Sequence, residues 1–324
     1  MNAECGMAQS DAGLRTNSAF NIQHSALKNN TLIVIAGPTA SGKTAFSIKL
    51  AKALNTVIIS ADSRQFYKEM SIGTAAPTPE ELLQVKHYFV HNISIEDKYD
   101  VADYEREVLL LLDELFKTHD QVVLTGGSGL FIDAVCNGID AMPEVQPEVR
   151  QKVDSLLKEC GIDALSKELQ QLDPEYFAVV DQQNPRRLQR ALEVCYQTGK
   201  PFSSFRTGTA VKRDFDIKKY ALLWDRQELI QRIDRRVDMM MEQGLLEEAH
   251  SLYPKRHLNA LNTVGYKELF SYFDGDCILE EAVEQIKIHT RQYAKRQMTW
   301  LRKDKGYRWI APEETADVVK ELQE

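Results

Sequence analysis

The sequence predicts an α/β fold, in which a phosphate-loop-type parallel sheet is flanked by helices and carries an all-helical insertion domain. Three observations predict it. An apolar run at residues 31–36 leads directly into a glycine-bounded loop and a helical pattern. Short apolar runs then alternate with helical patterns to about residue 135, as in repeated strand–helix–strand units. From about residue 143 to 199 helical periodicity replaces this alternation, and a strand pattern returns at residues 219–224.

The first predicted elements are the strand at residues 31–36, a G-x-x-x-x-G-K-T loop and a helix at residues 43–54. The loop residues are Gly37, Pro38, Thr39, Ala40, Ser41, Gly42, Lys43 and Thr44. A helix N-terminus has unpaired N–H groups, and glycines let a loop approach an anion closely, so this loop is predicted to bind a phosphate or diphosphate. Lys43 is expected to neutralise phosphate oxygens and Thr44 to ligate Mg²⁺. The motif does not establish that the bound molecule is ATP.

Asp62 is the second candidate functional residue, because it comes just after the apolar strand at residues 56–60. Ligands of open parallel sheets bind beyond the carboxyl ends of the strands, so Asp62 is expected to face the same cleft as the phosphate loop. Its carboxylate is suited to accept a proton from a substrate. From position alone, an N-cap for the following segment is a comparable interpretation.

The next predicted elements are a proline-marked loop at residues 77–79, a short helical pattern at 80–87, a helix at 101–116 and a strand at 121–125. The glycine-rich segment 125–129 follows that strand; it either permits close approach to a ligand or forms an ordinary turn. Phosphate-loop NTPases often have an Asp for Mg²⁺ at the end of such a strand, but Thr125 stands here. Asp225, which follows the strand at 219–224, resembles that feature only weakly.

The helical insertion is predicted at residues 141–204, between two parts of the α/β core at 31–140 and 205–324. Its helices are predicted at residues 149–160, 162–172 and 185–198. Asp173-Pro174 and Asn184-Pro185 each place a capping side chain before a proline suited to the first helical turn. After the insertion, helices are predicted at residues 227–253, 262–273 and 279–303, and a last strand at 307–310.

The composition is that of a soluble globular protein, with 43% hydrophobic and 27% charged residues in 324. No apolar run approaches the roughly 20 residues that span a membrane. Residues 1–30 are polar, do not resemble a signal peptide, and are interpreted as a flexible tail. The five cysteines lie far apart, which disfavours a zinc site or a disulfide framework and suits a reduced cytoplasm. A monomer is expected, since each chain contains a whole predicted site.

Basic residues are concentrated in three places, although the net charge is −8. Arg186, Arg187 and Arg190 begin a helix of the insertion, and Arg232, Arg235 and Arg236 share a helix of the returning core. Residues 285–308 contain eight basic residues and one acid, a local charge of +7: Lys287, Arg291, Lys295, Arg296, Arg302, Lys303, Lys305 and Arg308 against Asp304. Each cluster alone is most often a solvated helix face. Together they predict a polyanionic partner.

Helical spacing refines the last of these clusters. Ile286, Tyr293 and Trp300 fall on one stripe of the predicted helix, with Arg291, Lys295 and Arg302 nearly opposite. That arrangement predicts a buried face and a face that is available to phosphates.

An ordered set of segments resembles the tRNA dimethylallyltransferase family, also called tRNA isopentenyltransferase, over almost all of residues 31–310. The segments are Gly37–Thr44, Asp62-Ser63-Arg64-Gln65, Ile72-Gly73-Thr74-Ala75, Gly126-Gly127-Ser128-Gly129-Leu130, the run from Asn184 to Glu193, Thr263-Val264-Gly265-Tyr266 and the run from Lys295 to Arg302. The phosphate loop alone is shared by many enzymes, whereas the ordered set is specific to this family.

The resemblance implies transfer of the dimethylallyl group from dimethylallyl diphosphate to N6 of an adenosine beside the tRNA anticodon (position 37), which gives N6-dimethylallyladenosine. It implies Asp62 as general base, catalytic roles for Thr39 and Arg236, the phosphate loop as the diphosphate site, and Mg²⁺ as cofactor with Thr44 as ligand. The tRNA anticodon stem-loop is the implied partner. The implied tRNA contacts are Asp62, Ser63, Arg64, Gln65, Ser128, Arg150, Arg186, Arg187, Arg190, Asn262, Gly265, Tyr266, Lys267, Lys295, Arg296 and Arg302.

The chain departs from the family pattern at two positions. Ala76 stands where the family often has Lys, and Ser128 where it often has Thr. Two other functions are compatible with parts of the sequence. A small-molecule phosphate-loop kinase explains the loop but not the arginine clusters, and a non-catalytic RNA-binding module with a nucleotide-sensing loop explains the basic helix but gives Asp62 no task.

Overall fold

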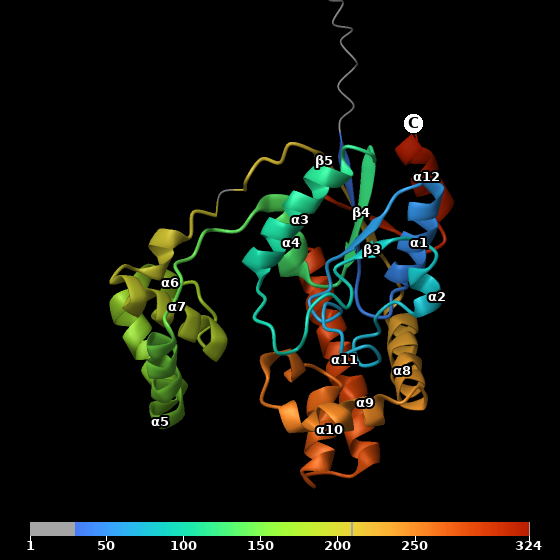
Figure 1. Cartoon of the computed structure of the whole chain (residues 1–324). Helices are drawn as coiled ribbons and strands as arrows, with labels where there is room; N and C mark the ends of the chain where they lie inside the picture. The colour runs from blue at the N-terminus through green and yellow to red at the C-terminus, as the bar shows by residue number, and fades with distance from the viewer. Residues whose placement is uncertain (1–29, 209, 324) are drawn as a thin grey trace, which may run out of the picture.

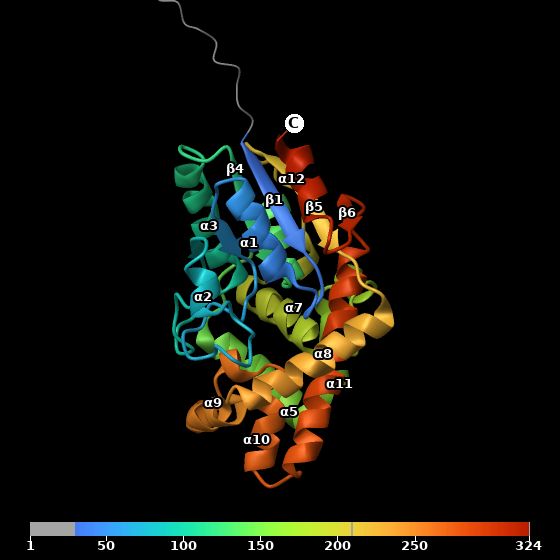
Figure 2. The same ribbon diagram turned by 90° about the vertical axis from the view of Figure 1, so that its right-hand side faces the viewer.

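The computed structural model describes residues 30–208 and 210–323, and it contains a six-stranded parallel sheet of strand order β3-β2-β4-β1-β5-β6 (Figures 1 and 2). The strands are β1 (Thr31–Ala36), β2 (Ile58–Ser60), β3 (His87–Tyr88), β4 (Gln121–Gly126), β5 (Asp216–Leu222) and β6 (Tyr307–Ile310). Ala36 pairs with Gly126 and with Ala221, and Ser60 pairs with Thr125. The carboxyl ends of β1, β2 and β4 therefore lie together at one edge of the sheet.

Helices cover both faces of the sheet, as expected for strands that are buried on both sides. On one face lie α3 (Val101–Leu115) and α4 (Gly129–Asn137), whose Tyr104 and Ile132 belong to the core cluster of β1, β2 and β4. On the other face lie α1 (Lys43–Ala53) and α12 (Thr315–Gln323), which contribute Phe46 and Val318 to a second cluster. The short α2 (Pro79–Leu82) lies near α1 (Figure 1). The predicted fold class is confirmed.

The insertion forms a helical lobe beside the sheet, on the left in Figure 1. It contains α5 (Pro147–Leu172), α6 (Pro174–Phe177), α7 (Pro185–Thr198) and the 3-10 turn η1 (Phe202–Phe205). Leu165, Leu169, Leu188 and Leu192 are fully buried in a core of the lobe's own. Gly161, with φ 76°, breaks α5 between the two helices that the sequence predicted.

A third group of helices packs below the carboxyl ends of the strands (Figure 2). It comprises α8 (Arg226–Glu242), α9 (Leu245–Leu252), η2 (Tyr253–Lys255), η3 (Asn259–Leu261), α10 (Tyr266–Phe273) and α11 (Leu279–Leu301). Helix α11 joins this group to the sheet, because its Ile286 packs in the core of the third group of helices and its Leu301 packs in the core of the sheet.

The structure corrects the sequence prediction in three places. The helix predicted at 227–253 is two helices, because Gly244 adopts φ 99° between α8 and α9. The helical pattern at 80–87 gives only one turn and then the edge strand β3, and α12 was not predicted. The predicted tail, residues 1–30, lies outside the described residues except for residue 30. Within the described part of the chain, none of the helices has the length and hydropathy to cross a bilayer.

Candidate active site

The phosphate loop turns sharply from β1 into α1. Gly42 is the N-cap of α1 with φ 85°, a left-handed conformation that glycine adopts without strain. The carbonyl oxygen of Pro38 accepts hydrogen bonds from Ser41 N at 3.2 Å and from the Lys43 ammonium at 2.8 Å. The loop therefore holds its own lysine at the N-terminus of the helix.

Asp62 lies across the sheet edge from this loop, just beyond β2. Its carboxylate accepts a hydrogen bond from Arg64 N at 3.2 Å, so it also stabilises the local turn. Two cavities, of about 930 Å³ and 710 Å³, meet at this point, and Asp62, Thr39, Arg236 and Tyr293 line both of them. The phosphate loop and the carboxylate therefore open into one shared chamber.

The larger cavity is defined by the phosphate loop and the arginines of α8, and we call it the donor-side cavity because the sequence predicts that this loop binds a diphosphate. Arg232, Arg235 and Arg236 line it together with the loop residues 39–44. Apolar side chains, including Ile72 and Met240, line its other wall. A cavity with a cationic end and an apolar wall suits a diphosphate ester with a short hydrocarbon group.

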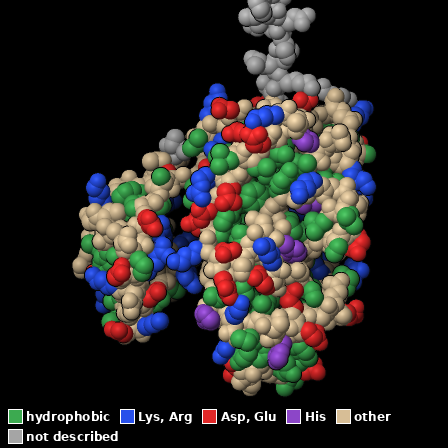
Figure 3. Space-filling model, in the orientation of Figure 1, with side chains coloured by type: hydrophobic (Ala, Val, Ile, Leu, Met, Phe, Trp, Pro, Cys, Tyr) green, Lys and Arg blue, Asp and Glu red, His purple; other side chains and the backbone are tan. Residues whose placement is uncertain are grey.

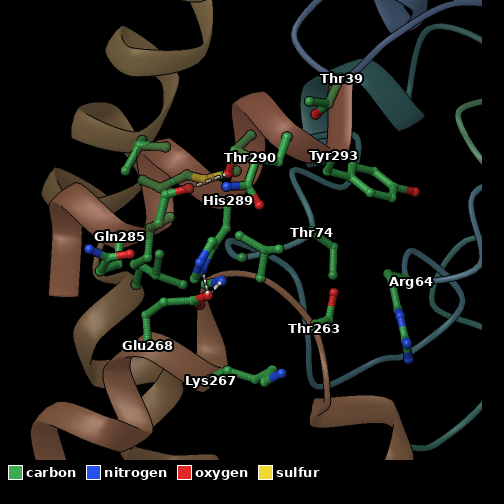
Figure 4. A pocket seen from close by; sticks show the side chains of 18 of the residues that line it. Thr39, Arg64, Thr74, Thr263, Lys267, Glu268, Gln285, His289, Thr290 and Tyr293 are labelled. Atoms are coloured by element: carbon green, nitrogen blue, oxygen red, sulfur yellow. Dashed lines mark hydrogen bonds and ion pairs between the residues drawn. The ribbon is translucent and has the colours of Figure 1, made fainter. Parts of the chain in front are cut away.

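The smaller cavity is lined by residues of α10, α11 and the loop before α10 (Figure 4), and we call it the RNA-side cavity because several of the tRNA contacts expected from the sequence line it. Thr39, Tyr293 and Arg64 lie around one end of it, and Glu268 and His289 lie around the other. His289 Nδ1 is 2.6 Å from the carboxylate of Glu268, whose other oxygen accepts from Gly265 N at 2.8 Å. This pairing fixes the loop before α10 against α11.

Arg236 is a partly buried cation that has no carboxylate partner at hydrogen-bonding distance among the described residues. Its Nη2 donates to the Thr39 hydroxyl at 2.5 Å, while its Nε is buried and has no hydrogen-bond partner in the described residues. Ser41 Oγ is buried and unpartnered in the same loop. Buried polar groups are costly unless they are paired, so these atoms indicate a ligand that bears hydrogen-bond acceptors. Burial lowers the pKa of Arg236, and nearby Asp62 opposes that shift.

Lys43 is perturbed by the same surroundings. Burial lowers the pKa of its ammonium to about 8, an effect that Asp62 opposes and that the positive charge of Arg236 reinforces. Among the described residues, Asp62 is the carboxylate whose charge acts on both Lys43 and Arg236, so one negative charge faces two positive ones. An anionic ligand would compensate the remaining positive charge.

The metal site expected at Thr44 has few protein ligands. Thr44 lines the donor-side cavity, but the Thr125 hydroxyl donates to Ile35 O at 3.2 Å and accepts from Ser47 Oγ at 2.9 Å. The described residues contain no group of three or more His, Cys, Asp or Glu side chains that could hold a metal. Mg²⁺ commonly binds through substrate phosphates, water and one or two protein oxygens, so these residues fit an Mg²⁺ that is held mainly by a bound diphosphate.

Several expected RNA contacts border the chamber. Ser63 N donates to Ser128 Oγ at 3.0 Å, and Arg64 donates to Ala260 O at 3.0 Å. Gln65 donates to Ala75 O at 3.1 Å, which ties the segment after Asp62 to the segment before α2. The RNA-side cavity is further lined by Asn262, Gly265, Lys267 and Arg296.

Tyr266, one of the implied tRNA contacts, lies inside the protein in this structure. Its side chain is fully buried, and its hydroxyl donates to Glu248 at 2.6 Å. The same carboxylate accepts from the backbone N–H groups of Ser71, Ile72 and Gly73 at 2.9–3.0 Å. Tyr266 and Glu248 therefore hold the segment that separates the two cavities.

The basic window at 285–308 is less positive than its residue count predicted. Lys287 pairs with Asp238 and Arg291 with Asp234, each at 2.7 Å, so α8 neutralises two of its charges. Arg308 pairs with Glu321 of α12. Five basic residues of the window are exposed and have no ion pair in the described chain: Lys295, Arg296, Arg302, Lys303 and Lys305.

The insertion carries exposed arginines, of which Arg186 faces the rest of the molecule. Arg150, Arg186 and Arg187 are exposed, and Arg190 makes a 3.5 Å pair with Glu193. Figure 3 shows Lys and Arg side chains gathered in the gap between the insertion and the remaining chain. Arg186 lines a small cavity of about 360 Å³ together with Lys267 and other residues near η3, so the two parts face each other there.

Gln297 is a site residue that the sequence analysis did not single out. It is only 7% exposed, and it lies four residues after Tyr293 on the inner stripe of α11. The sequence did contain one signal for Gln297. A polar amide lies on the same helical stripe as Ile286, Tyr293 and Trp300, where an apolar side chain is expected. Its partners, Thr39 and Gly127, are far from it in sequence.

Comparisons with known proteins identify the family of this chain. The family model for IPP transferase matches residues 65–304. The chain is 51% identical over 291 residues to tRNA dimethylallyltransferase 1 of Phocaeicola vulgatus, covering 90% of this chain and 97% of the relative. It is 52% identical over 288 residues to the tRNA dimethylallyltransferase of Christiangramia forsetii, covering 89% and 95%.

Solved structures give the same result. The crystal structure of the full-length tRNA isopentenylpyrophosphate transferase of Bacillus halodurans is similar with a TM-score of 0.67 and 33% identity, covering 91% of this chain and 96% of that one. A eukaryotic dimethylallyltransferase acting on tRNA has a TM-score of 0.68 and 28% identity, covering 84% and 70%. The chain therefore belongs to the tRNA dimethylallyltransferase, or IPP transferase, family.

Proposed function

We propose that this chain, a tRNA dimethylallyltransferase by family, transfers the dimethylallyl group of dimethylallyl diphosphate to N6 of adenosine 37 in the tRNA anticodon stem-loop. Asp62 is the general base in this proposal, and Arg236 and the phosphate loop bind the diphosphate. The observation that carries the proposal is Arg236, which lines the same chamber as Asp62 and whose buried Nε has no hydrogen-bond partner among the described residues. The kinase and the non-catalytic RNA-binding module are set aside, since relatives that match about nine-tenths of the chain are tRNA dimethylallyltransferases.

Donor binding follows from the charges around the chamber. The diphosphate gains negative charge as the allylic C–O bond breaks. Lys43, Arg236 and the N–H groups at the start of α1 stabilise that charge, and Thr39 orients Arg236 through its hydroxyl. Bound Mg²⁺, with Thr44 as a protein ligand, would further neutralise the diphosphate. The dimethylallyl group lies along the apolar wall at Ile72 and Met240.

Proton transfer follows from the position of Asp62 at the junction of the cavities. The N6 amino group of adenine is a weak nucleophile because its lone pair is delocalised into the ring. As the new N–C bond forms, N6 must lose a proton, and the Asp62 carboxylate accepts it. Turning an adenine out of its stack costs a few kcal/mol and is easier in a single-stranded loop, which favours an anticodon-loop substrate.

The RNA is held, in this proposal, by phosphate contacts on both sides of the RNA-side cavity. Arg186 and Arg187 of the insertion, and Lys295 and Arg296 of α11, are exposed and carry no ion pair in the described residues. Phosphate contacts of this kind position a nucleic acid and make its affinity fall with salt. We infer that the enzyme works as a monomer, because one chain supplies all these residues. We also infer that it works in the cytoplasm, the reduced compartment that its widely spaced cysteines suit.

Substitution of Asp62 tests the proposal. Asp62→Ala should abolish transfer, read by mass spectrometry of an anticodon stem-loop after incubation with dimethylallyl diphosphate, while its affinity for the RNA stays close to that of the wild type. Asp225→Asn is the matched control, since Asp225 also follows a strand but only caps α8, by accepting from Gln227 N at 2.7 Å. Full turnover by Asp62→Ala would remove Asp62 from the role of base.

A further inference from the structure

Gln297 joins the two walls of the chamber through a single side-chain amide. Its Oε1 accepts a hydrogen bond from Thr39 N in the phosphate loop at 2.8 Å, and its Nε2 donates to Gly127 O, beyond β4, at 2.8 Å. The residue is 7% exposed, and both hydrogen bonds are buried. In the interior such hydrogen bonds have well-defined geometry, and breaking them leaves the buried partners unpaired.

Each of these partners touches a reacting part of the site. The Thr39 hydroxyl accepts from Arg236, so the backbone position of Thr39 determines where the guanidinium is held. On the other wall, a Cβ added to Gly127 would lie 3.7 Å from Asp62 Oδ2, which places Gly127 in packing distance of the carboxylate. The Gln297 amide therefore sets the separation between the diphosphate-binding wall and the wall that carries Asp62.

Space at Gly127 is reserved for this amide. A Cβ at position 127 would lie 2.4 Å from Gln297 Nε2, well inside van der Waals contact. Gly127 has no left-handed φ, so an alanine there would collide with the amide and would not strain the backbone. Only a side chain with an acceptor and a donor on one planar group makes both hydrogen bonds at this position.

We propose that Gln297 is a positioning residue for dimethylallyl transfer, which holds the phosphate loop and the Asp62 wall at the separation that the reaction requires. It acts through Thr39, Arg236 and Gly127 and does not itself touch the reacting atoms. The inference rests on the proposed function. Through Gln297, helix α11 influences the geometry of the diphosphate site. The same helix carries Lys295 and Arg296.

A double-mutant cycle between positions 127 and 297 tests this proposal. Gln297→Ala is expected to lower kcat about 10- to 100-fold, with the Kd for the stem-loop changed less than about 3-fold. Gly127→Ala is expected to lower kcat similarly in the wild type, because the new methyl group displaces the amide, but to have little further effect in Gln297→Ala. Equal effects of Gly127→Ala in both backgrounds, or an unchanged kcat in Gln297→Ala, would overturn the proposal.

Gln297→Glu adds a readout that a purely structural role would not give. When ionised, its carboxylate faces Gly127 O without a proton to donate; when protonated, it reproduces the donor and acceptor of the amide. Its kcat relative to wild type should therefore rise as the pH is lowered from about 8 to 6. A ratio that stays constant over this range would contradict the proposal, and the measurement remains decisive if Gln297→Ala fails to fold.

A control and a reference reaction separate the possible failures. Gln121→Ala removes another long-range glutamine hydrogen bond, to Leu322 O at 2.7 Å, at the opposite end of β4. It should lower thermal stability without lowering kcat at a permissive temperature. If the wild-type protein fails to transfer the dimethylallyl group, the proposed function is wrong; if it transfers and the Gln297 variants match it, only this inference is wrong.

Discussion

Lys43 should take up protons when the diphosphate binds. In the ligand-free protein burial lowers its pKa to about 8, from an ordinary value of 10.5, so about half of the molecules carry a neutral Lys43 at pH 8. A bound diphosphate supplies negative charge beside the ammonium and restores its pKa to the ordinary value or above. Binding should therefore take up about 0.5 proton at pH 8, about 0.1 at pH 7 and about 0.9 at pH 9.

Isothermal titration calorimetry measures this uptake directly. Titrations of dimethylallyl diphosphate, at fixed Mg²⁺ and without tRNA, are repeated in buffers of different ionisation enthalpy. The slope of the observed heat against that enthalpy gives the number of protons. Phosphate esters lose their second proton near about pH 6, so the ligand adds little proton change at pH 8 or 9.

Lys43→Arg is the control. Its guanidinium stays charged throughout this pH range, so diphosphate binding to this variant should take up no protons at position 43. Heats that do not depend on the buffer at pH 8 in the wild type would refute the reasoning.

The same lowered pKa of Lys43 also determines how this residue makes protein stability depend on pH. Between about pH 8 and 10.5 the folded, ligand-free state binds fewer protons at Lys43 than the unfolded chain does, so this residue makes stability rise with pH across that window.

Three further predictions concern the donor site, the RNA face and the segment between the cavities. Arg236→Ala should lower kcat/KM for dimethylallyl diphosphate by roughly 10²–10³ in initial-rate assays, with tRNA affinity retained. Lys295→Ala should reduce the slope of log affinity against log salt by about 1, whereas Arg291→Ala should change it much less, because Arg291 pairs with Asp234; fluorescence anisotropy at several salt concentrations compares them. Glu248→Ala should lower the free energy of unfolding in urea denaturation by more than the cost of one unpaired buried group, about 1–3 kcal/mol, because it leaves three backbone N–H groups and the Tyr266 hydroxyl without their acceptor.

Local sequence was enough to predict the elements whose cause is local. The G-x-x-x-x-G-K-T loop, its strand and its helix are determined by glycines and by an adjacent apolar run, and the structure has β1 and α1 within one residue of the predicted bounds. Asp62 was predicted from a general property of parallel sheets, since strand ends share one edge. The two-residue strand β3 carries too little pattern to be recognised, because its hydrogen bonds to β2 are what define it.

Long-range contacts account for most of what the sequence did not reveal. Thr39 and Gln297 are 258 residues apart, so no local pattern relates them. The basic window was counted along one helix, whereas Asp234 and Asp238 neutralise it from α8. Tyr266 lies within a segment of the family resemblance, yet it is buried on Glu248. A shared motif does not tell a residue that touches a substrate from one that holds the site together.

Helix α11 shows why the two substrates should be coupled. Its 3.6-residue period points Tyr293 and Gln297, four residues apart, into the chamber, while Lys295 and Arg296 are exposed to solvent. A rigid helix cannot shift one of these faces without the other. A displacement of α11 that moves Lys295 and Arg296 also moves the amide on Thr39, and with it the partner of Arg236. Changes in the packing of α11 should therefore affect the kinetic constants for RNA and for diphosphate together, whereas changes confined to the insertion should affect the RNA alone.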